Sequence, residues 1–215
     1  MMKKVSAVLF FVFLALGAFT SNAQVFELTP TYGYQFGSKL NYGSNYLKVN
    51  DSGFFGLTAG FEARRDYMIE VTYYNMGTDL LIRDRILSPN ESKLADLNVD
   101  WFMVGGTRYF TNGNIKPFIG GQLGLSIYSP KNENRDIVNR SLDSATYFSF
   151  GFKGGVVIML TESIGLNFQG NLLFPVEWGG VYVGIGTGGP STGVSAGSTI
   201  IMGGFSGGLV FRFGA

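Results

Sequence analysis

The sequence predicts an all-β protein: an eight-stranded, antiparallel, up-and-down transmembrane β-barrel. Three observations support this fold class. Aromatic residues make up 15% of the chain and charged residues only 14%, yet no run after residue 24 has the roughly 18 apolar residues of a membrane-spanning helix. Apolar side chains instead recur at every second position in eight segments. Short and long connections alternate between these segments, as they do in barrels whose strands run up and down through a membrane.

The N-terminal segment is predicted to be a targeting sequence. Two lysines precede an apolar run from Ala7 to Phe19, and Ser21 and Ala23 are the small residues that a signal peptidase recognises. The apolar run is shorter than the roughly 20 residues that a membrane-spanning helix needs. We therefore expect a cleaved signal peptide over 1–23 and one barrel domain over 24–215.

Eight segments alternate apolar with polar or small side chains, which is the period of a strand with two different faces. Each is about as long as the 9 to 11 residues that a tilted strand needs to cross a hydrocarbon layer, or slightly longer. The predicted strands are Val25–Phe36, Gly53–Arg64, Tyr67–Gly77, Leu97–Phe110, Ile115–Tyr128, Thr146–Leu160, Ile164–Phe174 and Thr199–Phe213. Pro30 lies in the first strand, and because proline lacks an amide N–H we expect a bulge or a short pairing gap there.

The connections differ in length. Short turns are predicted at 65–66, 111–114 and 161–163, and long connections at Gly37–Ser52, Thr78–Asp96, Ser129–Ala145 and Pro175–Ser198. Both termini then fall at the short-turn end of the barrel. The last connection contains apolar residues at Val181–Ile185 and Val194, which indicate either an extension of the flanking strands, the interpretation we favour, or an apolar surface for a partner or an apolar ligand.

One face of each predicted strand is apolar, and we expect it to contact lipid. The outward residues, strand by strand, are Phe26, Leu28, Tyr32, Tyr34 and Phe36; Phe55, Leu57 and Phe61; Tyr67, Ile69, Val71 and Tyr73; Leu97, Val99, Trp101, Met103 and Tyr109; Ile119, Leu123, Leu125 and Ile127; Phe148, Phe150, Phe152, Val156 and Ile158; Ile164, Leu166, Phe168 and Leu172; and Phe205, Leu209, Phe211 and Phe213. The aromatic residues gather near both strand ends, which predicts two interfacial girdles.

The opposite face collects every charge of the strand bodies. These lumen residues are Glu27, Glu62, Glu70, Asp100, Arg108, Lys153 and Arg212. Because side chains fill the interior of an eight-stranded barrel, we expect a lumen charge network rather than a wide pore. The expected pairs are Glu27 with Arg212 where the first and last strands close the barrel, Glu70 with Arg108, and Asp100 with Lys153. The aromatic rings of Phe54, Phe102 and Phe118 are also predicted to help fill the lumen.

The C-terminal strand carries a recognisable pattern. Ser206 is followed by Gly208, and Phe211 and Phe213 are two aromatic residues spaced by one position. This pattern resembles the C-terminal insertion signal of bacterial outer-membrane barrels. From the signal peptide to Phe213, the chain resembles the small eight-stranded barrels of the OmpA membrane-domain, OmpX and OmpW type. The resemblance implies a bacterial outer-membrane location with periplasmic termini, contact with outer-membrane lipid, and recognition of the last strand by the barrel-assembly machinery.

Composition excludes several kinds of function. The chain has no His and no Cys, and therefore lacks the imidazole bases and thiolates of nucleophilic triads and of most zinc sites. Glu62 and Glu70 are neighbours across one hairpin, but we expect lumen carboxylates to pair with cations rather than to catalyse. Without Lys3 and Lys4, the 16 basic residues fall to 14 against 15 acidic ones, so no electrostatic footprint for nucleic acid exists.

These observations predict a non-enzymatic integral outer-membrane barrel that holds no cofactor and no metal. Its lumen is expected to be filled by side chains, and its long connections to act in envelope integrity or in surface contacts. The alternative is a narrow, porin-like transport protein that carries small or apolar solutes in the OmpW manner. A soluble lipocalin-like barrel would need the opposite partition, with charges outside and apolar groups inside.

Overall fold

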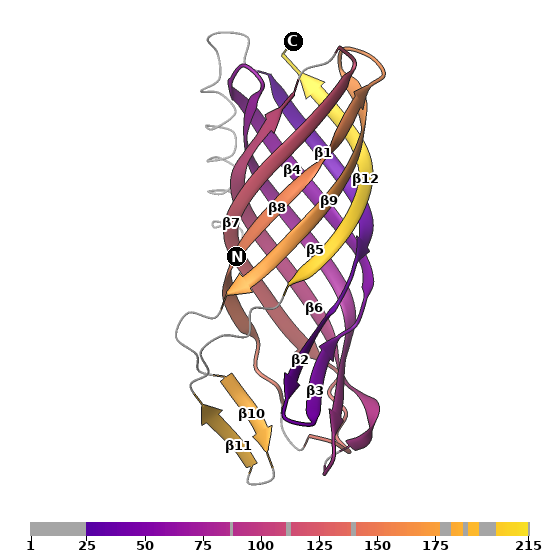
Figure 1. The fold of residues 1–215 in the computed structure, drawn as a ribbon, viewed down its shortest axis with the longest axis vertical. Coiled ribbons are helices and arrows are strands. Elements are labelled where there is room, and N and C mark those ends of the chain that lie inside the picture. The colour runs from indigo at the N-terminus through magenta and orange to yellow at the C-terminus, as the bar shows by residue number, and fades with distance from the viewer. Residues whose placement is uncertain are drawn as a thin grey trace, which may run out of the picture.

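One closed barrel dominates the structure (Figure 1). The structure is a computed structural model that describes residues 25–86, 88–110, 113–138, 141–176, 182–186, 189–193 and 201–214. The signal peptide expected over 1–23 lies outside the described residues. No helix in the described part of the chain is long and apolar enough to cross a membrane.

Eight antiparallel strands form the ring, which confirms the predicted fold class. They are β1 (Phe26–Gln35), β4 (Ser52–Arg64), β5 (Tyr67–Asp84), β6 (Ser88–Tyr109), β7 (Ile115–Lys131), β8 (Ala145–Met159), β9 (Ile164–Val176) and β12 (Met202–Phe213). Consecutive members pair with one another, and β1 pairs with both β4 and β12, so the sheet closes on itself. The short turns and both described chain ends lie at one end of the barrel (Figure 1).

Two of the predicted long connections are mostly strand. The segment predicted as a loop over Thr78–Asp96 continues β5 and β6, which pair from Tyr67↔Arg108 to Asp84↔Ser88. The segment predicted over Gly37–Ser52 contains a hairpin of β2 (Ser38–Tyr42) and β3 (Asn45–Val49), and β3 pairs with the extended β5. Polar side chains on both faces of these segments hid the alternation. The barrel therefore continues into a strand-built extension at the long-connection end (Figure 1).

The fourth long connection holds a separate two-stranded sheet. It consists of β10 (Tyr182–Gly186) and β11 (Gly189–Gly193), and these strands pair only with each other. The expectation of strands in this segment is therefore correct, but they form their own hairpin rather than an extension of β9 and β12. Val181 and Val194 lie outside the described residues.

Seven of the eight barrel strands face as predicted. Outward side chains such as those of Ile119 and Phe205 are more than half exposed, whereas the inward side chains of Glu27 and Lys153 are buried. Phe54 and Phe118 are buried on the lumen side, as expected. An apolar outer belt and a filled interior result.

The facing of β6 is the exception. Leu97, Val99, Trp101, Met103 and Tyr109 were expected to face outward, but they are buried in the interior. The side chain of Phe102, which was expected in the lumen, is 51% exposed on the outer surface. Both faces of β6 are apolar near its middle, so the facing predicted for this strand depends on the positions of its charged residues. Asp100 and Arg108 in fact face outward near the two ends of the apolar belt, where a charge costs far less than at the membrane centre.

The expected pairing defect at Pro30 is present as a gap. On the β12 side, Leu28↔Phe211 and Thr31↔Gly208 are paired, and no pair involves the two residues between them on β1. On the β4 side, Pro30 keeps its place opposite Leu57. The register is the same before and after the gap, so the missing amide N–H interrupts the ladder without a bulge.

Two apolar clusters fill opposite ends of the lumen. The long-connection cluster consists of Val49, Phe54, Tyr74, Met76, Leu97, Val99, Trp101, Met103, Tyr128, Leu173 and Met202. The short-turn cluster consists of Met68, Tyr109, Phe118, Val157, Met159 and Val210. A polar layer lies between them, because each strand that contributes to both clusters carries polar or glycine residues in between.

The orientation of β6 can be tested by tryptophan fluorescence. Trp178→Phe leaves Trp101 as the remaining tryptophan of a chain with two, and in vesicles containing brominated lipid we expect little quenching, because the indole lies in the lumen. A matched protein with Trp101→Phe, Phe102→Trp and Trp178→Phe should be strongly quenched, since its indole faces lipid. Equal quenching of the two proteins would contradict the orientation described here.

Candidate functional site

The polar layer of the lumen is the first candidate site. Along β5, Met68 of the short-turn cluster is followed on the inward face by Glu70 and Thr72, and then by Tyr74 of the long-connection cluster. Glu70 and Thr72 are buried. Buried charges and hydroxyl groups need partners, because water cannot solvate them in a closed interior.

Glu70 is the centre of one group of contacts in this layer. Lys153 of β8 forms an ion pair with Glu70 Oε2, and both side chains are almost fully buried. Thr107 of β6 donates a hydrogen bond of 2.8 Å to the same oxygen. The ammonium group of Lys153 also lies 5.9 Å from the centroid of the Phe118 ring. Side chains from β5, β6 and β8 thus meet at one carboxylate.

Glu27 and Arg212 lie at the seam where β1 meets β12. Their Cα atoms are register partners, and Arg212 Nη2 and Nε lie 2.7 and 2.8 Å from Glu27 Oε1. Tyr109 of β6 donates a 2.9 Å hydrogen bond to the other carboxylate oxygen of Glu27. The carboxylate therefore connects both closing strands and a strand on the other side of the lumen.

Neutral side chains occupy the rest of the layer. Gln122 donates to Thr72, whose hydroxyl lies 3.1 Å from that of Thr58, and Asn171 donates to Gln35. Four polar atoms of this layer are buried without a hydrogen-bond partner among the described residues; they are Gln35 Nε2, Asn167 Oδ1, Asn171 Oδ1 and Ser206 Oγ. The layer is dense but not fully paired.

Three of the predicted network residues lie elsewhere. Asp100 faces outward and accepts hydrogen bonds from Tyr73, Asn75 and Asn98 at 2.6 to 2.7 Å. Glu62 is partly buried, and its Oε1 accepts a hydrogen bond from the backbone N–H of Asp66 in the adjacent turn.

Arg108 is exposed on the outer surface. The expected pair of Glu70 with Arg108 is wrong, because the register partner of Glu70 on β6 is Gly105. The expected pair of Asp100 with Lys153 is also wrong, because Lys153 contacts Glu70 instead. Both errors follow from the reversed facing of β6.

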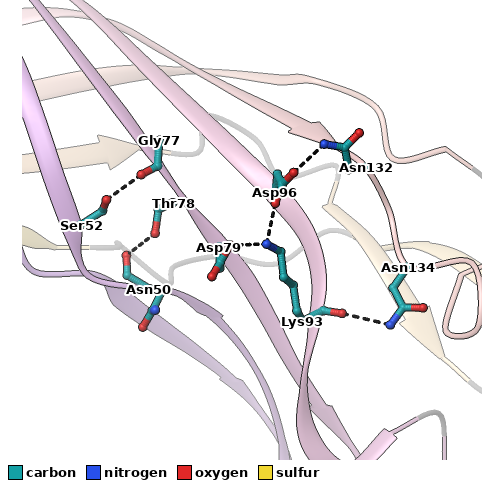
Figure 2. Close-up of polar contacts among 9 residues, drawn as sticks. All are labelled: Asn50, Ser52, Gly77, Thr78, Asp79, Lys93, Asp96, Asn132 and Asn134. Carbon is teal, nitrogen blue, oxygen red and sulfur yellow. Dashed lines mark hydrogen bonds and ion pairs between the residues drawn. The ribbon is translucent and has the colours of Figure 1, made fainter.

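A polar pocket at the long-connection end is a second candidate site. This rim pocket has a volume of about 480 Å³. It is lined by residues 50–51 between β3 and β4, Ser52 at the start of β4, 77–79 of β5, 96–98 of β6, and Lys131 at the end of β7. Figure 2 shows how its wall is held: Ser52 donates to the carbonyl oxygen of Gly77, and Thr78 donates to that of Asn50. The pocket lies where β5 passes from pairing with β4 to pairing with β3.

Fixed charges surround the rim pocket. Lys93 Nζ lies 2.6 Å from both Asp79 Oδ1 and Asp96 Oδ1, and Asn132 donates to the other oxygen of Asp96 (Figure 2). Hydrogen bonds to the two carboxylates raise the pKa of Lys93 to about 12. The hydrogen bond from Lys93 lowers the pKa of Asp96. Lys93 and Asp96 therefore stay charged at neutral pH beside a pocket with several polar lining residues.

The rim pocket could not be identified from the sequence, because most of its residues fall in segments predicted as loops. Asp96, Asn98 and Asp100 recur at every second position, and this polar alternation is the signal that could have indicated a strand face. Among the described residues, no group of three His, Cys, Asp or Glu side chains is placed to hold a metal ion.

Comparison with solved structures finds small outer-membrane barrels. The crystal structure of OprG from Pseudomonas aeruginosa matches with a TM-score of 0.64, 14% identity, and coverage of 90% of this chain and 98% of that one. Neisserial surface protein A (NspA) matches with a TM-score of 0.56, 13% identity, and coverage of 89% and 98%. AlkL in DMPC lipid bilayers matches with a TM-score of 0.50, 12% identity, and coverage of 89% and 90%. This chain therefore shares the fold of these proteins.

Neither a protein-family model nor a curated protein sequence matches the chain.

The ion pair at the seam generates a stability prediction. Arg212→Ala should lower the free energy of unfolding by about 3 kcal/mol, because the mostly buried Glu27 carboxylate loses its cation. Urea titration of the refolded protein in detergent micelles would measure this change. Glu27→Gln added to Arg212→Ala should restore part of the loss, since no unpaired charge then remains. An unchanged unfolding midpoint in Arg212→Ala would show that closure does not depend on the pair.

The pair of Lys153 with Glu70 generates a second prediction. Lys153→Met alone should destabilise the barrel by about 3 kcal/mol, because it leaves Glu70 charged in a dry interior. The double variant Lys153→Met with Glu70→Gln should lie close to the wild type, since a neutral amide can still accept from Thr107. Urea midpoints of the two variants would be compared, and equal destabilisation would argue against an unpaired charge as the cause.

Proposed function

We propose that the protein is a non-enzymatic integral barrel of the bacterial outer membrane, with a lumen filled by side chains and both termini in the periplasm. The apolar outer belt supports membrane insertion, because removing so many exposed apolar side chains from water is strongly favourable. The fold that the chain shares with OprG and NspA supports a location in the outer membrane rather than in another membrane. The role of the barrel is in envelope integrity or in surface contacts through its long connections.

The layered lumen is the observation that carries the proposal. The long-connection cluster includes three methionines with no exposed surface, Met76, Met103 and Met202, together with the nearly fully buried Trp101. The polar layer behind it is held by an ion pair and a hydrogen bond that cross the lumen. A hydrated solute would have to displace both layers, so an open diffusion pore is disfavoured.

The strand-built extension and the rim pocket support a role at the external surface. The extension has a small apolar core of its own, in which Ile82, Leu94 and Val138 are buried. It is therefore a folded surface rather than a set of loose loops. The rim pocket presents fixed carboxylates and Lys131 beside this surface. Such a surface suits contacts with polar molecules or with a partner protein.

Transport of small or apolar solutes is the second candidate function. The methionines of the long-connection cluster favour it, because their unbranched, flexible side chains can repack around a small apolar guest. The wall at the seam also has a pairing gap at Pro30. Transport requires the long-connection cluster to open, whereas a role as a barrel with a filled lumen requires the cluster to stay closed.

The last strand supports a proposal about assembly. Phe211 and Phe213 face outward on β12, and Ser206 and Gly208 face the lumen. We propose that these four residues form the insertion signal that the barrel-assembly machinery recognises. Recognition would precede closure, because β12 later pairs on both of its edges.

Planar-bilayer recording would separate the two functions. The purified wild-type protein should give no steady discrete openings, because both lumen layers are filled. Trp101→Gly removes the largest fully buried side chain among the described residues and should give small openings if the wild-type lumen is sealed by side chains. Steady openings of the wild-type protein would contradict the filled lumen and favour transport.

A further inference from the structure

Two arginines and a tyrosine form a row on the outer surface at the short-turn end. The Cα of Tyr67, the first residue of β5, is the register partner of Arg64 on one side and of Arg108 on the other. Register partners in antiparallel strands carry their side chains on the same face, which applies directly to Tyr67 and Arg108. On β4 the register shifts between Glu62 and Arg64, so that two residues of β4 lie opposite one of β5 at this point. All three side chains are exposed. The row therefore spans β4, β5 and β6.

Neither arginine has an ion-pair partner within the described part of the chain. None of the ion pairs and hydrogen bonds found among the described residues includes Arg64 or Arg108. The guanidinium group of Arg108 lies 5.5 Å from the centroid of the Phe110 ring, which orients it by a cation–π contact. By contrast, Arg65 in the adjacent turn lies 3.9 Å from Asp66. Arg64 and Arg108 are thus available to an external anion.

The row lies where the apolar belt ends. Ile69 and Val71 continue from Tyr67 along the outer face of β5 and are exposed, as belt residues are. Gly106 is the next outward residue of β6, and a Cβ there would collide with the hydroxyl group of Tyr67. The tyrosine ring therefore leans over Gly106 toward the belt, and its hydroxyl lies deeper than the level of Arg108. This depth is that of the lipid headgroups and the ester groups below them.

We propose that Arg64, Tyr67 and Arg108 bind the headgroup of an anionic phospholipid in the leaflet at the short-turn end. This inference rests on the proposed membrane insertion. Guanidinium groups bind phosphate oxygens in a bidentate manner. Neighbouring strands are about 4.8 Å apart, so the two arginine backbones are separated by roughly 10 Å, and both side chains can reach one phosphodiester. The Tyr67 hydroxyl is placed to donate to an ester carbonyl.

Native mass spectrometry of the full chain, purified in detergent, would test the site. Phosphatidylglycerol would be titrated into wild type, into Arg64→Gln with Arg108→Gln, and into the control Arg65→Gln. We expect the double variant to bind roughly tenfold more weakly, because two cations at the headgroup are lost. The control should bind like the wild type. Phosphatidylethanolamine should bind more weakly than phosphatidylglycerol to the wild type, since its amine offsets the phosphate charge.

Four further measurements distinguish the possible outcomes. Heat-dependent gel mobility would report whether each variant folds, and Arg64→Lys with Arg108→Lys, which keeps both charges, should bind with intermediate strength. Inorganic phosphate at millimolar concentration should not displace the lipid, because it lacks the acyl chains held by the belt. Equal affinity of wild type and the folded double variant, or an equal loss in Arg65→Gln, would overturn the site. A chain that stays soluble without detergent would instead overturn membrane insertion.

Discussion

The pairing of β1 with β12 is the interaction on which the rest of the structure depends. In a hydrocarbon layer every backbone N–H and C=O must find a partner within the protein, and this seam removes the two edges that an open sheet would leave. The ion pair between Glu27 and Arg212 lies on the seam itself. Once the ring is closed, each strand has one face toward the lumen and one toward the surroundings, so a period of two decides the position of every side chain.

Closure also explains the order of layers inside the barrel. Glu70 and Lys153 are held between apolar groups on both sides, and a charge in such surroundings persists only with a partner. The same interior is too narrow to hold water and side chains together in large amounts. The packing of side chains from eight strands into a small cross-section therefore stabilises the barrel, and the same packing prevents a wide passage through it.

Much of this architecture could be predicted from alternation alone, as the outward rows that contain Phe168 and Phe205 show. Alternation failed on β6, where Trp101 and Phe102 are both large and apolar, so charge had to decide and pointed the wrong way. The penalty for an outward charge falls to about 0–1 kcal/mol near an interface, and Asp100 is satisfied there by three donors. The rim pocket could not be predicted for a related reason: beyond the apolar belt, polar side chains occur on both strand faces, so Asp79 and Lys93 resemble loop residues.

Pro30 makes the seam asymmetric. The first strand keeps its pairing with β4 at this residue but loses it with β12, so the two sides of β1 differ in strength at mid-height. Local opening begins where backbone bonds are fewest. Because β12 pairs with β9 without such a gap, we expect β12 to separate from β1 before it separates from β9.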